Sequence, residues 1–134
     1  MRRAAVAAAL ALAGLTGCGT PSADLLVIDR GGNLPDARVT LRVGDGGTVR
    51  CDGAERTLPN DLLLDARDLT RDVQPLLERN ARLPIPPTAI LRYRVTGEGG
   101  GVRFADASPR LPAVLGRLIR FTRAVATRSC GLDR

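Results

Sequence analysis

Alternation of apolar and polar residues predicts several short β-strands in this chain. Residues 37–43 alternate most clearly, with alanine, valine or leucine at every second position and arginine or threonine between them. Residues 48–52 and 89–96 repeat the pattern, residues 25–28 form an apolar run typical of a buried strand, and residues 102–104 indicate one more. We therefore predict about five strands, the first three as an antiparallel meander and the last two as a hairpin.

A first helix is predicted between the third and fourth strands. Apolar residues recur there three or four positions apart over residues 62–77, which is the spacing of one helix face. Asn60 or Asp61 supplies a side chain that can cap its N-terminus. Pro75 interrupts the pattern, and proline removes a helical hydrogen bond, so we expect the helix to end or kink near Val73.

The C-terminal segment predicts a second helix. Ser108 is a favourable N-cap residue, and Pro109 after it suits the first helical position. An apolar stripe follows over residues 111–125, and Gly131 can end the helix. Two helices with apolar stripes and an antiparallel sheet with one apolar face predict a two-layer α+β sandwich, in the order β-β-β-α-β-β-α, with both helices on one face of the sheet. Residues 25–134 would form this single domain.

The N-terminal residues have the pattern of a secretory signal. Residues 1–17 begin with two arginines and continue as an uncharged apolar run, shorter than the roughly 20 residues that span a bilayer as a helix. The run ends in Leu15-Thr16-Gly17-Cys18, which resembles the lipobox of bacterial lipoproteins. The resemblance implies that Cys18 carries a diacylglycerol thioether and begins the mature chain, with residues 18–24 as the lipidated cysteine and a short tether.

This lipobox predicts a location for the protein. Two acyl chains are enough for stable anchoring, so we expect a lipid-anchored protein on the extracytoplasmic face of the cell membrane. As a whole, the chain resembles small lipoproteins of actinobacteria. The two remaining cysteines, Cys51 and Cys130, agree with export, because an even pair in an exported domain predicts a disulfide. A redox or metal pair is the alternative, but the sequence has no Cys-x-x-Cys motif and no histidine to support it.

Catalytic chemistry has little support in this sequence. Without histidine, Ser/His and Cys/His pairs and histidine-based metal sites are excluded. Asp65, Asp68 and Asp72 fall on one side of the first predicted helix, but Arg67 and Arg71 interleave with them, which favours a solvated, salt-bridged face over a Ca²⁺ or acid–base site. We therefore predict a non-enzyme without catalytic residues, without a metal and without a cofactor other than the lipid on Cys18.

Charge gives the most specific prediction about partners. All 20 basic residues are arginine, and the net charge of +6 falls to +4 when Arg2 and Arg3 leave with the signal. If the apolar side of each strand faces the helices, six arginines share the opposite face, namely Arg38, Arg42, Arg50, Arg92, Arg94 and Arg103. Such a face suits phospholipid headgroups, wall phosphate polymers or an acidic protein. The alternative is a solvated face balanced by nearby aspartates. Nucleic acid is not expected, because aromatic residues for stacking are nearly absent.

A proline-rich segment supports a second hypothesis. Leu83-Pro84-Ile85-Pro86-Pro87 must be extended, and a rigid extended loop over residues 79–87 loses little entropy on entering a protease cleft. Arg30-Gly31-Gly32 after the first strand, the pair 90–95 and 102–104, and the closing helix resemble emfourin-type inhibitors of thermolysin-family metalloproteases. A further similarity is to the subtilisin inhibitors of actinobacteria, which carry a second disulfide that this chain lacks. These resemblances imply protease inhibition as the alternative function. The other interpretation of the loop is a stiff connection between a helix and a strand.

Overall fold

A single antiparallel sheet of six strands runs through the part of the chain that the structure describes. The structure is a computed structural model, and it describes residues 23–133. The strands are β1 (Asp24–Gly32), β2 (Val39–Gly44), β3 (Thr48–Cys51), β4 (Ala54–Thr57), β5 (Leu91–Gly97) and β6 (Gly100–Ala105), and the helices are α1 (Asn60–Glu78) and α2 (Ala113–Arg128). The spatial order of the strands is β4-β3-β2-β1-β5-β6, so β1 is an inner strand between β2 and β5.

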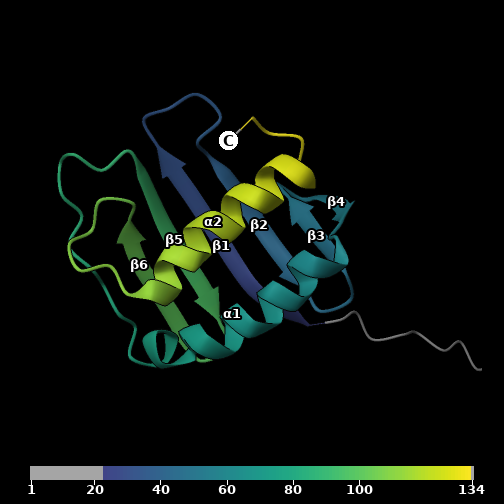
Figure 1. Cartoon of the computed structure of the whole chain (residues 1–134), viewed down its shortest axis with the longest axis horizontal. Helices are drawn as coiled ribbons and strands as arrows, with labels where there is room; N and C mark the ends of the chain where they lie inside the picture. The colour runs from purple at the N-terminus through teal and green to yellow at the C-terminus, as the bar shows by residue number, and fades with distance from the viewer. Residues whose placement is uncertain (1–22, 134) are drawn as a thin grey trace, which may run out of the picture.

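Both helices lie on the same face of this sheet, as Figure 1 shows. The core fills the space between the two layers. Alternate residues of β1, β2, β3, β5 and β6 face the helices, and the buried ones, including Ile28, Leu41 and Phe104, meet the apolar stripes of α1 and α2. The core residues all lie between Leu25 and Leu132, so residues 19–134 contain the entire described core. The predicted two-layer α+β sandwich is confirmed.

The sheet has one strand more than predicted. β4 pairs with β3 through the register Val49↔Arg56 and Arg50↔Glu55, which makes the order β-β-β-β-α-β-β-α. All four residues of β4 are exposed. A strand that buries neither face shows no alternation of apolar and polar residues, so hydrophobic patterning could not find it.

The first helix continues beyond the expected end near Val73. It runs to Glu78 with Pro75 inside it, and Leu76 and Leu77 remain buried against the sheet. Pro75 is exposed, so water can satisfy the carbonyl group that the missing N–H leaves without a helical partner. The N-cap residue is Pro59 with no side-chain cap, so neither Asn60 nor Asp61 has the predicted capping role.

The second helix begins later than predicted. Its N-cap residue is Pro112, and Arg110 before it has a positive φ of 50°, which no helix accommodates. The Ser108 hydroxyl instead accepts a hydrogen bond from the Ala105 N–H at 2.9 Å and donates one to the Pro84 carbonyl at 2.8 Å. Gly131, as predicted, lies just past the helix end, with a φ of 69°.

The predicted disulfide is present. Cys51 at the end of β3 and Cys130 after α2 are joined with a Cα–Cα distance of 5.7 Å, across a sequence separation of 79 residues. The bond therefore ties the end of the last helix to the sheet. Within residues 23–133, neither helix is long and apolar enough to cross a membrane.

Candidate functional site

The six predicted arginines lie where the sequence pattern places them, on the sheet face that points away from the helices. All six side chains are exposed. Five of them belong to strands, and Arg38 directly precedes β2. This surface, defined by Arg38, Arg42, Arg50, Arg92, Arg94 and Arg103, is called the open face below.

Cross-strand register brings these arginines together in pairs. Arg42 on β2 is directly opposite Arg50 on β3, and Arg94 on β5 is directly opposite Arg103 on β6. An isolated β-bridge places Arg82 beside Arg103. Arg94, Arg103 and Arg82 therefore lie next to one another at the β6 edge of the sheet. Like charges directly opposite each other destabilise a sheet. The open face therefore concentrates positive charge at a cost to the free domain.

Acidic residues on the open face offset part of this charge, since Asp29 is directly opposite Arg94 and Glu55 is directly opposite Arg50. Asp24 forms a 3.3 Å ion pair with Arg42. Asp29 accepts a hydrogen bond from the Thr40 hydroxyl, and Asp52 accepts one from the Thr40 backbone N–H, each at 2.8 Å. The Asp29 and Asp52 carboxylates thus link β2 to β1 and to the turn that follows β3. Among the described residues, no ion pair engages the other five arginines of the open face, namely Arg38, Arg50, Arg92, Arg94 and Arg103.

The open face has two hollows that these arginines line, and each leaves space for a ligand group. One, of about 440 Å³, is lined by Arg38, Arg92, Arg94 and Arg103, by the acidic residues Asp29 and Asp52, and by Ile85 of the proline-rich loop. The other, of about 680 Å³, lies near the start of β1 and is lined by Arg42 and Arg50 and by the acidic residues Asp24 and Glu55. Guanidinium groups form bidentate hydrogen bonds with phosphate and carboxylate oxygens. The arrangement can therefore hold several anionic groups on one extended surface.

Charges on the helix layer are arranged differently. Arg117 of α2 contacts Asp72 at 2.7 Å and Asp65 at 3.6 Å, and Arg71 contacts Asp68 at 2.6 Å. The aspartate cluster is therefore the salt-bridged face that the sequence favours, although its main partner comes from α2. Arg67 turns instead to Asp45 at 2.6 Å. Within residues 23–133, no group of three or more potential metal ligands gathers.

The proline-rich loop is fixed to the sheet. The Arg103 N–H donates to the Ala81 carbonyl at 3.0 Å, and the Leu83 N–H donates to the Arg103 carbonyl at 2.9 Å. Together with the Ser108 bond to Pro84, these contacts attach residues 81–84 to β6 and its following turn. Ile85, which follows them, is 43% exposed. Several backbone groups of the loop are thus already hydrogen-bonded within the domain.

Sequence reasoning missed Arg30. This residue is on β1 in the inward phase, with Leu26 and Ile28, and it is 3% exposed. Its guanidinium donates to the Ala37 carbonyl at 2.7 Å and to the Asp36 carbonyl at 3.1 Å. Burial lowers the pKa of Arg30. The signal in the sequence that could have identified Arg30 is an arginine at a strand position whose neighbours two residues apart are buried.

The lipidation prediction at Cys18 lies outside the described residues, as does the tether up to residue 22. Comparisons of the chain with known protein families, with curated proteins and with solved structures give no significant match. The resemblances to bacterial lipoproteins and to emfourin-type inhibitors therefore remain predictions, and a functional interpretation has to start from the geometry of the domain.

Proposed function

We propose that this protein is a lipid-anchored, extracytoplasmic binding domain without catalytic activity, and that its open face binds a phosphate-bearing surface of the cell envelope. The observation that carries the proposal is the pairing of Arg42 with Arg50 and of Arg94 with Arg103 across neighbouring strands. Such pairs weaken the free domain, and an anionic partner removes the repulsion.

The position of the lipobox agrees with this use of the open face. Only five residues, 19–23, separate Cys18 from β1, and extended chain spans about 20 Å from Cys18 to Asp24. Because β1 is an inner strand, the tether leaves from within the sheet rather than from one edge. Arg42 is at the tether end, where it pairs with Asp24. A lipidated Cys18 would hold the open face within reach of headgroups and wall polymers.

Binding of oxidised residues 19–134 to phosphate-bearing probes tests the proposal. We expect binding to phosphatidylglycerol vesicles and to soluble poly(glycerol phosphate), none to phosphatidylcholine vesicles, and a loss of binding as salt rises. Binding to the vesicles alone would identify headgroups as the source of phosphate, and binding to the polymer alone would identify the wall. Binding to neither probe would overturn the proposal.

Charge reversal locates the binding surface. The double variant Arg42→Glu/Arg92→Glu should weaken binding by about tenfold or more, because it reverses two charges on the open face. The matched control is Arg56→Glu/Arg120→Glu, which makes the same change in net charge at exposed residues away from the open face. Equal losses in the two double variants would show that net charge alone drives binding and would contradict a specific face.

Protease inhibition is the second candidate, and one observation favours it. Ile85 is exposed on a loop whose backbone is held by β6 and Ser108, so an apolar side chain is presented with little freedom to lose. Titration against thermolysin-like and subtilisin-like proteases tests this directly. Stoichiometric inhibition that Ile85→Asp abolishes and Arg42→Glu/Arg92→Glu leaves intact would establish the inhibitor. Digestion or no effect would exclude it.

A further inference from the structure

Gly31 leaves a gap between two arginines of the open face. It is directly opposite Arg92 of β5. Arg38 lies on its other side, because Arg38 precedes Val39, which pairs with Arg30. A side chain added at Gly31 would meet open space, with no atom within 4 Å of its Cβ. Gly31, Arg38 and Arg92 all line the hollow of about 440 Å³, so two guanidinium groups flank a stretch of bare backbone.

The two arginines beside this gap are available to a ligand. Both side chains are exposed, and within residues 23–133 neither Arg38 nor Arg92 takes part in an ion pair. Because Gly31 has no side chain, an anion can come close to the backbone between them. Guanidinium groups form bidentate hydrogen bonds with phosphate oxygens. The gap therefore suits one phosphate group held from two sides.

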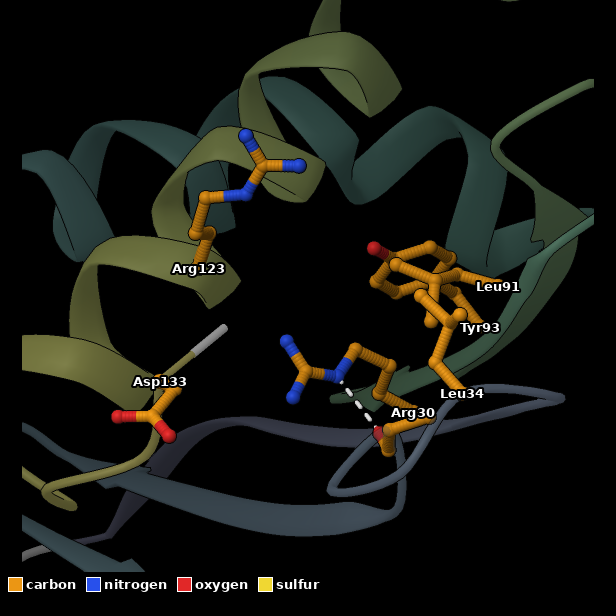
Figure 2. A pocket seen from close by; sticks show the side chains of 7 residues that line it. Arg30, Leu34, Leu91, Tyr93, Arg123 and Asp133 are labelled. Atoms are coloured by element: carbon orange, nitrogen blue, oxygen red, sulfur yellow. Dashed lines mark hydrogen bonds between the residues drawn. The ribbon is translucent and has the colours of Figure 1, made fainter.

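Arg30 and Tyr93 are in the inward phase of their strands, although atoms of both also line this hollow. Figure 2 shows the Arg30 guanidinium and the Tyr93 hydroxyl turned into the cavity that they share with Arg123 on the helix side of the sheet. There Arg30 donates a hydrogen bond to the Ala37 carbonyl at 2.7 Å. A ligand on the open face therefore relies on neither of these polar groups.

Two carboxylates lie further along the same hollow. Asp29 is two residues before Gly31 on β1, which is about 7 Å along the strand. Asp29 accepts a hydrogen bond from the Thr40 hydroxyl, and Asp52 accepts one from the Thr40 N–H. A carboxylate has about four acceptor sites, so both can still accept hydrogen bonds from a ligand's hydroxyl groups. Arg94 is directly opposite Asp29, and its charge disfavours a ligand ammonium group at this place.

We infer that this hollow binds one glycerol phosphate group, an inference that rests on the proposed binding of phosphate at the open face. The phosphate lies over Gly31, between the two arginines that flank it. The glycerol hydroxyl groups donate to Asp29 and Asp52, and the carbon chain lies beside Ile85, which is 43% exposed. The volume of about 440 Å³ is that of a small-molecule site. Phosphatidylglycerol headgroups and poly(glycerol phosphate) both carry this group.

Calorimetric titration of oxidised residues 19–134 with free glycerol phosphate tests the chemical class. We expect saturable binding that is about fivefold or more tighter than that of ethyl phosphate, which lacks the hydroxyl groups. Phosphoethanolamine, which carries an ammonium group in their place, should also bind more weakly. No saturation, equal binding of ethyl phosphate, or tighter binding of phosphoethanolamine would overturn the inference.

Gly31→Leu fills the gap and leaves every charge in place. The open space at Gly31 and its φ outside the left-handed region allow leucine without strain. We expect the affinity for glycerol phosphate to fall by about tenfold or more, since leucine occupies the place of the phosphate. Thr96→Leu, exposed on β5 but outside the lining of this hollow, is the matched control and should leave the affinity unchanged. An unchanged affinity in Gly31→Leu would overturn the inference.

Two arginine variants compare the two hollows without altering Gly31. Arg92→Gln should weaken glycerol phosphate binding by about tenfold or more, because a hydrogen bond between charged groups is lost. Arg42→Gln, in the other hollow, should leave it unchanged. Equal losses in Arg92→Gln and Arg42→Gln would show that the ligand is not in this hollow.

Vesicle and polymer binding of Gly31→Leu separates this inference from the proposed function. Gly31→Leu keeps all the arginines, so its residual binding should remain salt-sensitive but become weaker for the probe that supplies the glycerol phosphate group. Weaker binding to phosphatidylglycerol vesicles would identify the headgroup as that source, and weaker binding to poly(glycerol phosphate) would identify the wall. Unchanged binding to both probes would overturn the inference alone. Absence of binding in the unsubstituted domain would overturn the proposed function itself.

Discussion

At the scale of single residues, arginines on the two sides of the sheet have different surroundings. On the helix side they meet carboxylates, as in the pair of Arg128 with Asp61 at 2.7 Å, where the Arg128 hydrogen bonds hold the pKa of Asp61 below its ordinary value. On the open face, Arg103 lies between Arg94 and Arg82. The first arrangement is neutralised within the domain, and the second keeps positive charges beside one another that an external anion could neutralise.

Arg103→Gln should therefore stabilise the free domain while weakening its binding to phosphatidylglycerol vesicles. Removal of the central charge relieves repulsion with both neighbours, and we expect the free energy of unfolding to rise by about 0.5 kcal/mol. Chemical denaturation measures the stability, and Arg120→Gln on α2 is the control. A clear loss of stability in Arg103→Gln would show that the arginine supports the fold instead of serving a partner.

Tyr93 gives a prediction for alkaline pH. Burial raises the pKa of its phenol above the ordinary value of about 10, and the charge of Arg30 only partly opposes this effect. A raised native pKa means that the neutral phenol stabilises the fold, and this contribution is complete below the unfolded pKa. The free energy of unfolding should thus fall as the pH rises from about 10 toward the native pKa.

The ultraviolet titration of tyrosinate measures this directly, because Tyr93 is the only tyrosine. The same titration in denaturant supplies the unfolded reference. The native curve should lie at higher pH than the unfolded curve, and coincident curves, or a native curve at lower pH, would show that the phenol is not desolvated.

At the scale of elements, the helix layer is held to the sheet at the Cys51–Cys130 bond and at the core. Replacement of both cysteines by serine should lower the free energy of unfolding by about 4 kcal/mol, because the bond closes a long loop in the unfolded chain. Denaturation of the oxidised domain and the double variant measures the difference. A loss below about 1 kcal/mol would mean that the core alone fixes α2.

Hydrophobic patterning found the strands and helices that bury one face and missed the strand that buries neither face. It located β2, β3, β5 and β6 because their inward residues alternate, it located β1 from its apolar run, and it failed on the fully exposed β4. It ended α1 too early, since the burial of Leu76 and Leu77 outweighs the cost of Pro75. It also assigned Ser108 to a helix cap, although tertiary contacts with Pro84 decide its role.

The positions of the open-face arginines were also predictable from the alternation of residues along the strands. Strand alternation fixes which side a residue takes, so Arg42 and Arg94 were placed before any contact was known. The cavity that Arg30, Arg123 and Asp133 line on the helix side of the sheet was not predictable, because these residues come near one another only through the packing of α2 and the C-terminal residues on the sheet. The separation of these residues along the sequence does not show that they lie near one another in the fold.

At the scale of the whole molecule, an anchor at Cys18 and a positive open face would act together. Each alone gives weak or unspecific attachment, and together they hold the domain against an anionic surface. Cys18→Ala in the full chain should release the protein from membranes and leave a mature chain without a lipid mass. Membrane fractionation and mass spectrometry check both points. A Cys18→Ala protein that still fractionates with membranes and retains a lipid mass would contradict the lipobox assignment.

The central claim is that the open face, and not net charge, binds phosphate-bearing surfaces. The most direct measurement compares the affinity of Arg42→Glu/Arg92→Glu and of Arg56→Glu/Arg120→Glu for phosphatidylglycerol vesicles and poly(glycerol phosphate) at low and high salt. We predict a loss of about tenfold or more in the first variant, little change in the second, and convergence of all proteins at high salt. Equal affinities for the two variants at low salt would contradict the claim.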